Sequence, residues 1–279
     1  MGVYAVTGAA SGMGKASADR LRAAGHTVIG VDLRDVEVVA DLSTPQGRST
    51  AIRQTLELAE GRLDGAVLAA GLGPVPGKEA IIAQVNVRGV IDLLVGWRPA
   101  LAATGNSKVV VFGSNSTTAT PAVPNSAVKA FLAGNLDKGV RCASRISAAA
   151  GPFTYAASKI AVTRWARRTA VTEQWAGSGI RLNVLAPGAI STPLLEAQLS
   201  GPEAKRVENF PVPIGGYGEA AQIAEWVEFM LSTAANFMVG SVVVVDGGTD
   251  AYFRADDWPV AVPARAVPKY VRRMMSFKR

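Results

Sequence analysis

Short Val-rich segments alternate with helix-like segments along most of the chain, and this alternation restricts the possible folds. The Val-rich runs are continuously apolar, which is typical of strands in a parallel sheet that helices cover on both faces. We expect strands within residues 3–8, 26–32, 37–43, 63–71, 107–114, 179–188 and 240–248. We expect helices within residues 11–25, 45–61, 81–103, 155–176 and 219–231. The pattern predicts an α/β fold with a doubly wound parallel sheet in a single domain.

A cluster of glycines follows the first predicted strand and opens the first predicted helix. The stretch "TGAASGMGK" does not fit a triphosphate-binding loop, because Lys15 is followed by Ala16 instead of Ser or Thr. The glycines suit the pyrophosphate of a dinucleotide better. Gly8 turns the chain out of the strand, while Gly12 and Gly14 let the backbone and the helix N-terminus approach the phosphates.

An acidic residue at the end of the second predicted strand indicates which dinucleotide is bound. Asp32 can accept hydrogen bonds from both ribose hydroxyls of an adenosine, and it repels a 2′-phosphate. The nearby Arg34 could bind such a phosphate, but no Arg or Lys stands inside the glycine loop before Gly14. The sequence therefore favours NAD as the cofactor.

Two residues in the stretch "YAASK" suggest acid–base chemistry. Tyr155 and Lys159 lie four positions apart, on the same face of a predicted helix. A free tyrosine has a pKa near ~10, and a nearby ammonium lowers that pKa by favouring the phenolate. The pair could interconvert an alcohol and a carbonyl. Taken alone, the same spacing also fits an amphipathic helix with a half-buried Tyr and a solvated Lys.

The span from Met1 to about Tyr252 resembles the short-chain dehydrogenase/reductase family. The matching pieces, in order, are "TGAASGMG", Asp32, "ADLS", "LAAG", "QVNVRG", "VVVFGS", "YAASK", "LNVLAPG" with "ST", and "VVVVDGG". The resemblance implies a Rossmann-type domain over residues 1–253, and an NAD-dependent oxidoreductase that acts on CH–OH donors. Residues 254–279 would be a basic C-terminal extension.

The resemblance assigns roles to the matched positions. Tyr155 would be the general acid/base, Lys159 would lower its pKa and bind the nicotinamide ribose, and Ser114 would hydrogen-bond the substrate oxygen. We choose Ser114 over its hydroxyl neighbours because the predicted strand ends just before it. Asn86 would hold a water that relays protons to Lys159. The cofactor would be bound by Gly8, Ser11, Gly12, Met13, Gly14, Asp32, Asp41, Leu42, Gly71, Tyr155, Lys159, Ile190 and Thr192.

Three features depart from the family pattern. "LAAG" stands where the family usually has "NNAG", so two polar residues are lost. Asp41 ends the third predicted strand only nine positions after Asp32, which is too short for a crossover containing a helix. Ser114 and Tyr155 lie 41 positions apart, and the extra segment, about residues 120–151, is helical by composition. These departures resemble the bacterial 3α-hydroxysteroid dehydrogenase/carbonyl reductase subgroup, in which such an insertion carries a subunit contact. A lid or surface decoration is the alternative.

The stretch from Pro193 to Gly218 should form the substrate loop. Its apolar residues are Leu194, Leu195, Leu199, Phe210, Val212 and Ile214. They suit a lipophilic secondary alcohol and its ketone, with a 3α-hydroxysteroid as one candidate. A dehydrogenase for a non-steroidal alcohol and a non-catalytic NAD-binding regulator or scaffold are the alternatives. The intact set Asn86, Ser114, Tyr155 and Lys159 argues against the regulator.

Composition restricts the remaining choices. The chain has one cysteine and one histidine, so we expect no metal site and a cytoplasmic protein. No apolar stretch reaches ~18 residues, so we expect no membrane span and no stable membrane insertion. The net charge is +7, of which six positive charges lie in the last fifteen residues, so we expect no nucleic-acid partner. We expect a homodimer or homotetramer, with the basic extension as a surface arm, a wrap onto a neighbouring subunit, or an amphipathic segment on anionic lipid.

Overall fold

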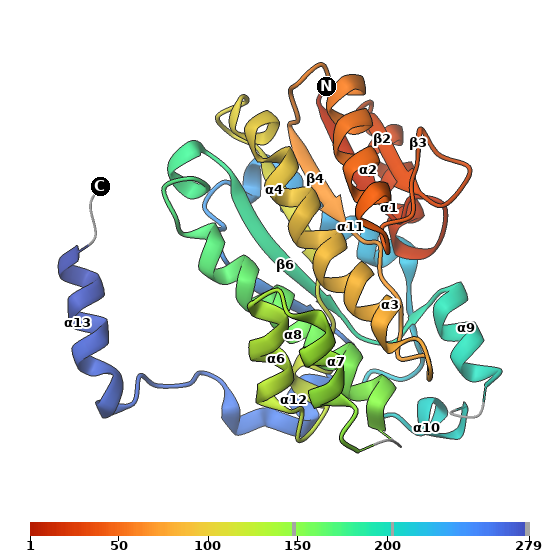
Figure 1. The fold of residues 1–279 in the computed structure, drawn as a ribbon, viewed down its shortest axis with the longest axis vertical. Helices are drawn as coiled ribbons and strands as arrows, with labels where there is room; N and C mark the ends of the chain where they lie inside the picture. The colour runs from red at the N-terminus through yellow and green to blue at the C-terminus, as the bar shows by residue number, and fades with distance from the viewer. Residues whose placement is uncertain (147–148, 202–203, 277–279) are drawn as a thin grey trace.

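A seven-stranded parallel sheet forms the centre of the computed structural model, which describes residues 1–146, 149–201 and 204–276 (Figure 1). Its strand order is β3-β2-β1-β4-β5-β6-β9, and all the pairings are parallel. The strands are β1 (Val3–Thr7), β2 (Thr27–Asp32), β3 (Val38–Val39), β4 (Gly65–Leu68), β5 (Lys108–Phe112), β6 (Arg181–Pro187) and β9 (Val242–Val245). The predicted doubly wound α/β fold is confirmed.

Helices cover both faces of the sheet. On one face, α1 (Gly12–Ala23) packs against α11 (Ala220–Leu231). The other face carries α2 (Pro45–Leu58), α4 (Gly89–Ala102) and α8 (Ala150–Ala170). Successive residues of β1 point into the two cores in turn: Ala5 lies in the larger core, and Tyr4 and Val6 lie in the smaller one. Burial on both faces explains why the strand sequences are continuously apolar.

The helical run before β5 is divided into three parts. It consists of α3 (Glu79–Ala83), a π-helical turn (Gln84–Arg88) and α4, where the sequence predicts one helix over residues 81–103. In the described part of the chain, Glu79–Ala102 is the one helical run that is long and apolar enough to cross a membrane. Half of its most apolar window is buried inside the protein, and core helices of soluble proteins pass the same test, so this is weak evidence for a span.

The connection between β2 and β3 contains no helix, as its length predicts. Glu37, in this connection, contacts β2 and α1. Glu37 accepts a hydrogen bond from the backbone N–H of Gly30 at 2.7 Å and pairs with Arg22 at 3.0 Å. The backbone N–H of Ala40 donates to the carbonyl of Asp32 at 2.8 Å, which joins the two strand ends directly.

The insertion before Tyr155 is helical in its described residues. Helix α5 (Ser116–Ala119) precedes the insertion, which contains α6 (Asn125–Leu132) and α7 (Leu136–Ala143). Helices α6 and α7 pack on each other and on α8. Helix α7 crosses α6 closely, because a Cβ atom at Gly139 would overlap the ring of Phe131. Helix α8 begins at Ala150 and ends at Ala170, whereas the sequence predicts residues 155–176. Residues 147 and 148 of the insertion lie outside the described residues.

Smaller elements complete the chain beyond β6. They are β7 (Ile190–Ser191), α9 (Pro193–Leu199), α10 (Ala204–Glu208), β8 (Gly218–Glu219), α12 (Thr249–Arg254) and α13 (Val267–Ser276). Strands β7 and β8 pair in a separate parallel ribbon. An arm leads from α12 to α13, which stands apart from the body of the molecule (Figure 1).

Candidate active site

The glycine loop lies at the carboxyl edge of the sheet, where the strands of the parallel sheet end. Gly8 has a φ of +72°, and a Cβ atom there would lie 2.9 Å from the backbone nitrogen of Ala70. A Cβ atom at Gly14 would overlap the carbonyl oxygen of Gly8. Any other residue would therefore push the first turn of α1 away from β1. These contacts hold the N-terminus of α1 close to the end of β4.

The N-terminus of α1 fits an anionic group. Ser11 is the N-cap of α1, and within the described residues its side chain makes no capping hydrogen bond. Gly12 and Met13 begin the helix, and its first turn contains no acidic residue. The N–H groups of this turn therefore present partial positive charge at the carboxyl edge. This is the donor set that a pyrophosphate requires.

The predicted adenosine side of the site lies at the ends of β2 and β3. Asp32 contacts the glycine loop, because its Oδ2 accepts a hydrogen bond from the backbone of Ala10 at 2.9 Å. Its Oδ1 accepts from the backbone of Leu33 at 2.7 Å. Asp41 is exposed and Leu42 is buried, just beyond β3. A carboxylate fixed against the glycine loop suits the ribose hydroxyls of a dinucleotide.

A buried arginine that the sequence analysis missed holds this adenosine side in place. Arg48 donates to the carbonyl of Leu42 at 3.0 Å and pairs with Asp92 of α4 at 2.9 Å. It also donates to the side chain of Gln84 at 3.3 Å, in the π-helical turn. The contacts explain why a charged residue is buried in α2. A charged residue within an amphipathic helix carries no sequence signal of such a role.

Helix α8 carries Tyr155 and Lys159 toward the end of β5. The ammonium of Lys159 donates to the carbonyl of Phe112 at 2.8 Å, next to the strand end that Ser114 follows. Burial lowers the pKa of Lys159 from 10.5 to about 8, because a low-dielectric environment disfavours the charged amine. Burial raises the pKa of Tyr155, and a hydrogen bond with Ser114 lowers it by less.

The balance at Tyr155 differs from the sequence-based expectation. We expected the Lys159 charge to lower the tyrosine pKa, but desolvation of the phenol raises that pKa and outweighs the lowering effect of Ser114. The Tyr155 hydroxyl is therefore protonated at neutral pH in this arrangement. The structure does bring the Ser114 side chain close enough to Tyr155 to act on its pKa, although the two residues lie 41 positions apart in the sequence.

Asn86 lies close to Lys159 in the π-helical turn. Its side chain exchanges two hydrogen bonds with the backbone of Leu72, at 2.9 Å and 3.0 Å. Gly71 lies between the two side chains, since a Cβ atom there would be 3.2 Å from Asn86 Oδ1 and 3.4 Å from Lys159 Nζ. The structure thus brings together the predicted Asn86, Lys159 and Gly71, and a side chain at position 71 would crowd the other two. The water relay assigned to Asn86 stays a prediction.

A second residue that the sequence analysis missed links Asn86 to the tyrosine. Ser158 is fully buried, accepts a hydrogen bond from Asn86 Nδ2 at 3.3 Å, and donates to the backbone carbonyl of Tyr155 at 2.6 Å. Ser158 belongs to the stretch "YAASK" and lies next to Lys159. This position was the one feature of the sequence that could have indicated a role for Ser158. It holds the turn of α8 that presents Tyr155.

The loop after β6 closes the opposite side of the site. Thr192 Oγ1 donates to the carbonyl of Ile190 at 3.1 Å and accepts from the backbone of Leu195 at 3.4 Å, as the N-cap of α9. A Cβ atom at Gly12 would lie 3.4 Å from the Thr192 methyl group, so this loop touches the glycine loop. The predicted nicotinamide-binding residues therefore adjoin the predicted pyrophosphate-binding residues.

Only some of the apolar side chains in the predicted substrate loop are buried. Leu195 is buried, and Leu194 of α9 lies against Gly73, where a Cβ atom would be 2.9 Å from Leu194 Cδ1. Ile214 is 82% exposed. The loop after β4 and helix α9 thus contact each other. Among the described residues, no group of three His, Cys, Asp or Glu side chains could hold a metal ion.

Comparisons with known proteins agree with this geometry. A family model described as Enoyl-(Acyl carrier protein) reductase matches residues 139–250. The 3-alpha-hydroxysteroid dehydrogenase/carbonyl reductase of Comamonas testosteroni is 36% identical over 255 residues, which covers 91% of this chain and 98% of that protein. The levodione reductase of Leifsonia aquatica is 31% identical, over 90% of this chain and 95% of that protein.

A solved structure is also similar to this chain over nearly its whole length. The 3-alpha-hydroxysteroid dehydrogenase from Pseudomonas sp. B-0831, crystallised in complex with NADH, superposes with a TM-score of 0.86. The two chains are 41% identical, and the match covers 92% of this chain and 100% of that one. The likeness therefore extends over most of the fold of this chain.

Proposed function

Because the chain belongs to the short-chain dehydrogenase/reductase family of oxidoreductases, we propose that it uses NAD to interconvert a lipophilic secondary alcohol and its ketone. A 3α-hydroxysteroid is the first candidate substrate. One observation carries the proposal. Tyr155 and the Ser114 side chain that acts on its pKa lie at the same strand end as Lys159, beside a helix N-terminus that suits a pyrophosphate.

The proposed mechanism assigns the proton to Tyr155. When bound, the nicotinamide would give a hydride to the carbonyl carbon or take one from the carbinol carbon. In reduction, the Tyr155 phenol would donate its proton to the substrate oxygen, since burial keeps the phenol protonated at neutral pH. Ser114 would donate a hydrogen bond to the same oxygen and stabilise its developing charge. Oxidation would run the same steps in reverse.

Lys159 would return the proton to the phenolate. Its pKa of about 8 makes the ammonium a readier donor near neutral pH than an exposed lysine. Asn86 lies on the other side of Gly71, where a water could connect Lys159 to solvent. Lys159 would also hydrogen-bond the nicotinamide ribose, while Thr192 and the Ile190 backbone would bind the carboxamide.

Asp32 supports NAD over NADP. Both of its carboxylate oxygens lie at the end of β2 beside the glycine loop, so a 2′-phosphate there would meet a negative charge. Asp41, Leu42 and Gly71 would surround the adenine and its ribose. The NADH complex of the Pseudomonas 3-alpha-hydroxysteroid dehydrogenase is consistent with this preference.

The direct test is NAD reduction by the purified protein with androsterone, followed by nicotinamide absorbance. We expect turnover with NAD and much slower turnover with NADP. Absence of turnover, with NADH still binding tightly, would exclude the steroid. A panel of non-steroidal alcohols and ketones would then separate a dehydrogenase with another substrate from a non-catalytic NAD-binding regulator.

A further inference from the structure

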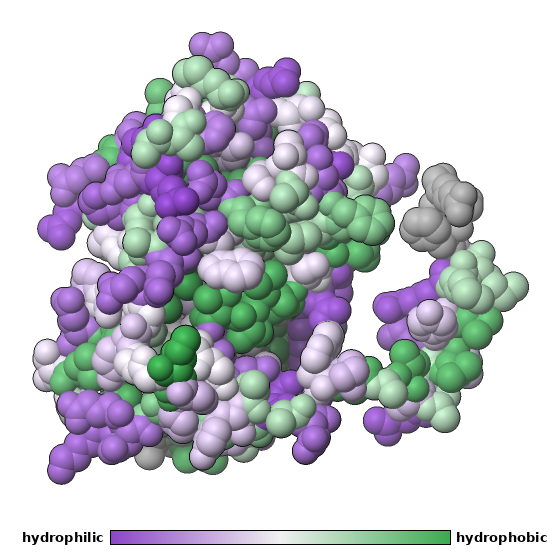
Figure 2. Space-filling model, turned by 180° about the vertical axis from the view of Figure 1, so that it is seen from behind, coloured by the Kyte–Doolittle hydropathy of each residue, from purple (hydrophilic) through white to green (hydrophobic). Residues whose placement is uncertain are grey.

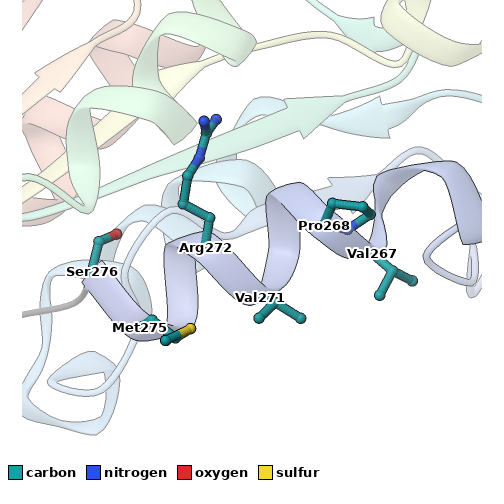
Figure 3. A pocket seen from close by; sticks show the side chains of 6 residues that line it. All are labelled: Val267, Pro268, Val271, Arg272, Met275 and Ser276. Carbon is teal, nitrogen blue, oxygen red and sulfur yellow. The ribbon is translucent and has the colours of Figure 1, made fainter.

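Helix α13 has two chemically distinct halves. Its apolar side chains recur at helical spacing, so they gather on one side of the axis. They are Val267, Tyr270, Val271, Met274 and Met275, and the basic side chains Lys269, Arg272 and Arg273 lie between them in sequence on the other side. In Figure 3, Val267, Val271 and Met275 extend from one side of the helix and Arg272 from the other.

The apolar half of α13 is open to solvent. Every residue of the helix is exposed, and Met274 and Met275 reach 66% and 79%. Figures 1 and 2 show the helix standing away from the body, with hydrophobic and hydrophilic surface side by side on it. The arm before it exposes Trp258 at 77%. An exposed apolar face of this kind is typical of an interaction site.

The charge of the arm indicates the kind of partner. The sequence contains no Asp or Glu after Asp257, and Arg265, Lys269, Arg272 and Arg273 are basic residues of the described part of the arm. Of the net charge of +7, six positive charges lie in the last fifteen residues, so the rest of the chain carries about +1. The body of a second copy would therefore offer this helix no overall electrostatic attraction, whereas an anionic lipid surface would.

We propose that α13, together with Trp258, is a docking surface for membranes that contain anionic lipids. The helix would lie in the plane of the interface, with its apolar half among the upper acyl chains and its basic half among the headgroups. Trp258 and Tyr270 are aromatic residues of the kind that prefer this boundary. The arm would keep the body beside the bilayer without inserting any other segment. This proposal does not depend on the proposed substrate.

The test is co-sedimentation of the full chain with vesicles of phosphatidylcholine, alone or mixed with phosphatidylglycerol. We expect binding to the mixed vesicles, weaker binding to phosphatidylcholine alone, and release as salt is raised, because salt screens the charge attraction. Arg272→Glu with Arg273→Glu should lower binding to the mixed vesicles at least about tenfold, given roughly 1 kcal/mol per basic residue near the surface. Val271→Asp should lower binding at every salt concentration.

Arg53→Glu with Arg62→Glu is the matched control. Both residues are exposed on the body, and the pair makes the same change in net charge. If this control loses as much binding as the α13 variants, general charge is responsible and the proposal is overturned. The proposal is also overturned if wild type does not bind the mixed vesicles, or if Val271→Asp leaves vesicle binding intact but lowers the molar mass measured by light scattering. That last result would assign α13 to contact with a second copy.

Discussion

Tyr155 and Ser114 meet across the fold, and this contact gives the sharpest prediction at the scale of single residues. Tyr155→Phe removes the hydroxyl but keeps the ring on α8, so the neighbouring residues of the proposed cofactor site should stay in place. We expect turnover to fall by roughly two to four orders of magnitude, with NADH affinity nearly unchanged. Steady-state rates and an NADH fluorescence titration measure both. Near-normal turnover would contradict the acid/base role.

The buried amine of Lys159 predicts how stability depends on pH. Its pKa is about 8 in the folded chain and 10.5 when unfolded, so below pH 8 both states are charged and the burial penalty is complete. Between pH 8 and 10.5 the unfolded chain holds a proton that the folded chain has released, so stability gains with rising pH. Lys159→Met removes this titration.

The measurement for Lys159 is denaturant unfolding of wild type and Lys159→Met at pH 7 and pH 9.5. We expect wild type to gain about 2 kcal/mol relative to the variant between the two pH values. The change is read as a difference, because the variant also loses the hydrogen bond to Phe112 at every pH. A difference that does not vary with pH would contradict a lysine pKa of about 8.

Asp32 predicts the cofactor preference. Asp32→Asn keeps the shape of the side chain and removes the charge that opposes a 2′-phosphate. We expect the ratio of kcat/KM for NAD to that for NADP to fall about tenfold, since a hydrogen bond to a charged group contributes about 1.5–3 kcal/mol. Asp35→Asn, an exposed acid three positions away, is the control and should leave the ratio unchanged.

At the scale of elements, the packing of the insertion depends on one glycine. Gly139→Ala would place a methyl group in the ring of Phe131, so α7 must move away from α6. We expect a loss of about 1–3 kcal/mol in unfolding free energy, measured from the denaturant midpoint. Lys138→Ala, on the exposed side of the same helix, should change it little. Equal effects would mean that α7 does not pack on α6 as described.

The sequence predicted an element correctly where a single local pattern was enough to identify it. Continuous Val runs mark strands that are buried on both faces, and the short spacing from Asp32 to Asp41 excludes a helix. The start of α8 at Ala150 was missed because the five residues before Tyr155 include Pro152, which helices tolerate only near their first turn. The π-helical turn around Asn86 was missed because its amino-acid composition does not differ from that of an ordinary α-helix.

The position of a candidate site residue was predictable where its side chain carries distinctive chemistry. Tyr155, Lys159 and Asp32 carry charge or a titratable proton, and the structure puts them at the expected edge of the sheet. Arg48 and Ser158 were missed because their contribution is positional, through contacts with Leu42 and Asn86 that only the tertiary structure creates.

On the scale of the whole molecule, the fold separates two regions with different charge. The body carries the sheet and the candidate site, while the basic extension of residues 254–279 ends in α13, away from the body (Figure 1). We propose that the molecule is a homodimer or homotetramer, and that α6 and α7 contribute a subunit contact. Light scattering of the full chain measures the mass, and a monomer would contradict both statements.

We expect the one hydroxyl of Thr192 to serve both sides of the candidate site. The same oxygen that caps α9 would bind the nicotinamide carboxamide, and α9 carries Leu194 against the loop after β4. We therefore expect an ordered mechanism, in which the cofactor binds first and the alcohol second. A carboxamide bound to Thr192 would hold α9, and with it Leu194, in the position that the alcohol contacts. Androsterone should therefore bind more tightly with NADH, which cannot accept the hydride of the 3α-carbinol, than without it. Calorimetry of the two titrations would reveal the order, and equal affinities would mean that either ligand can enter first.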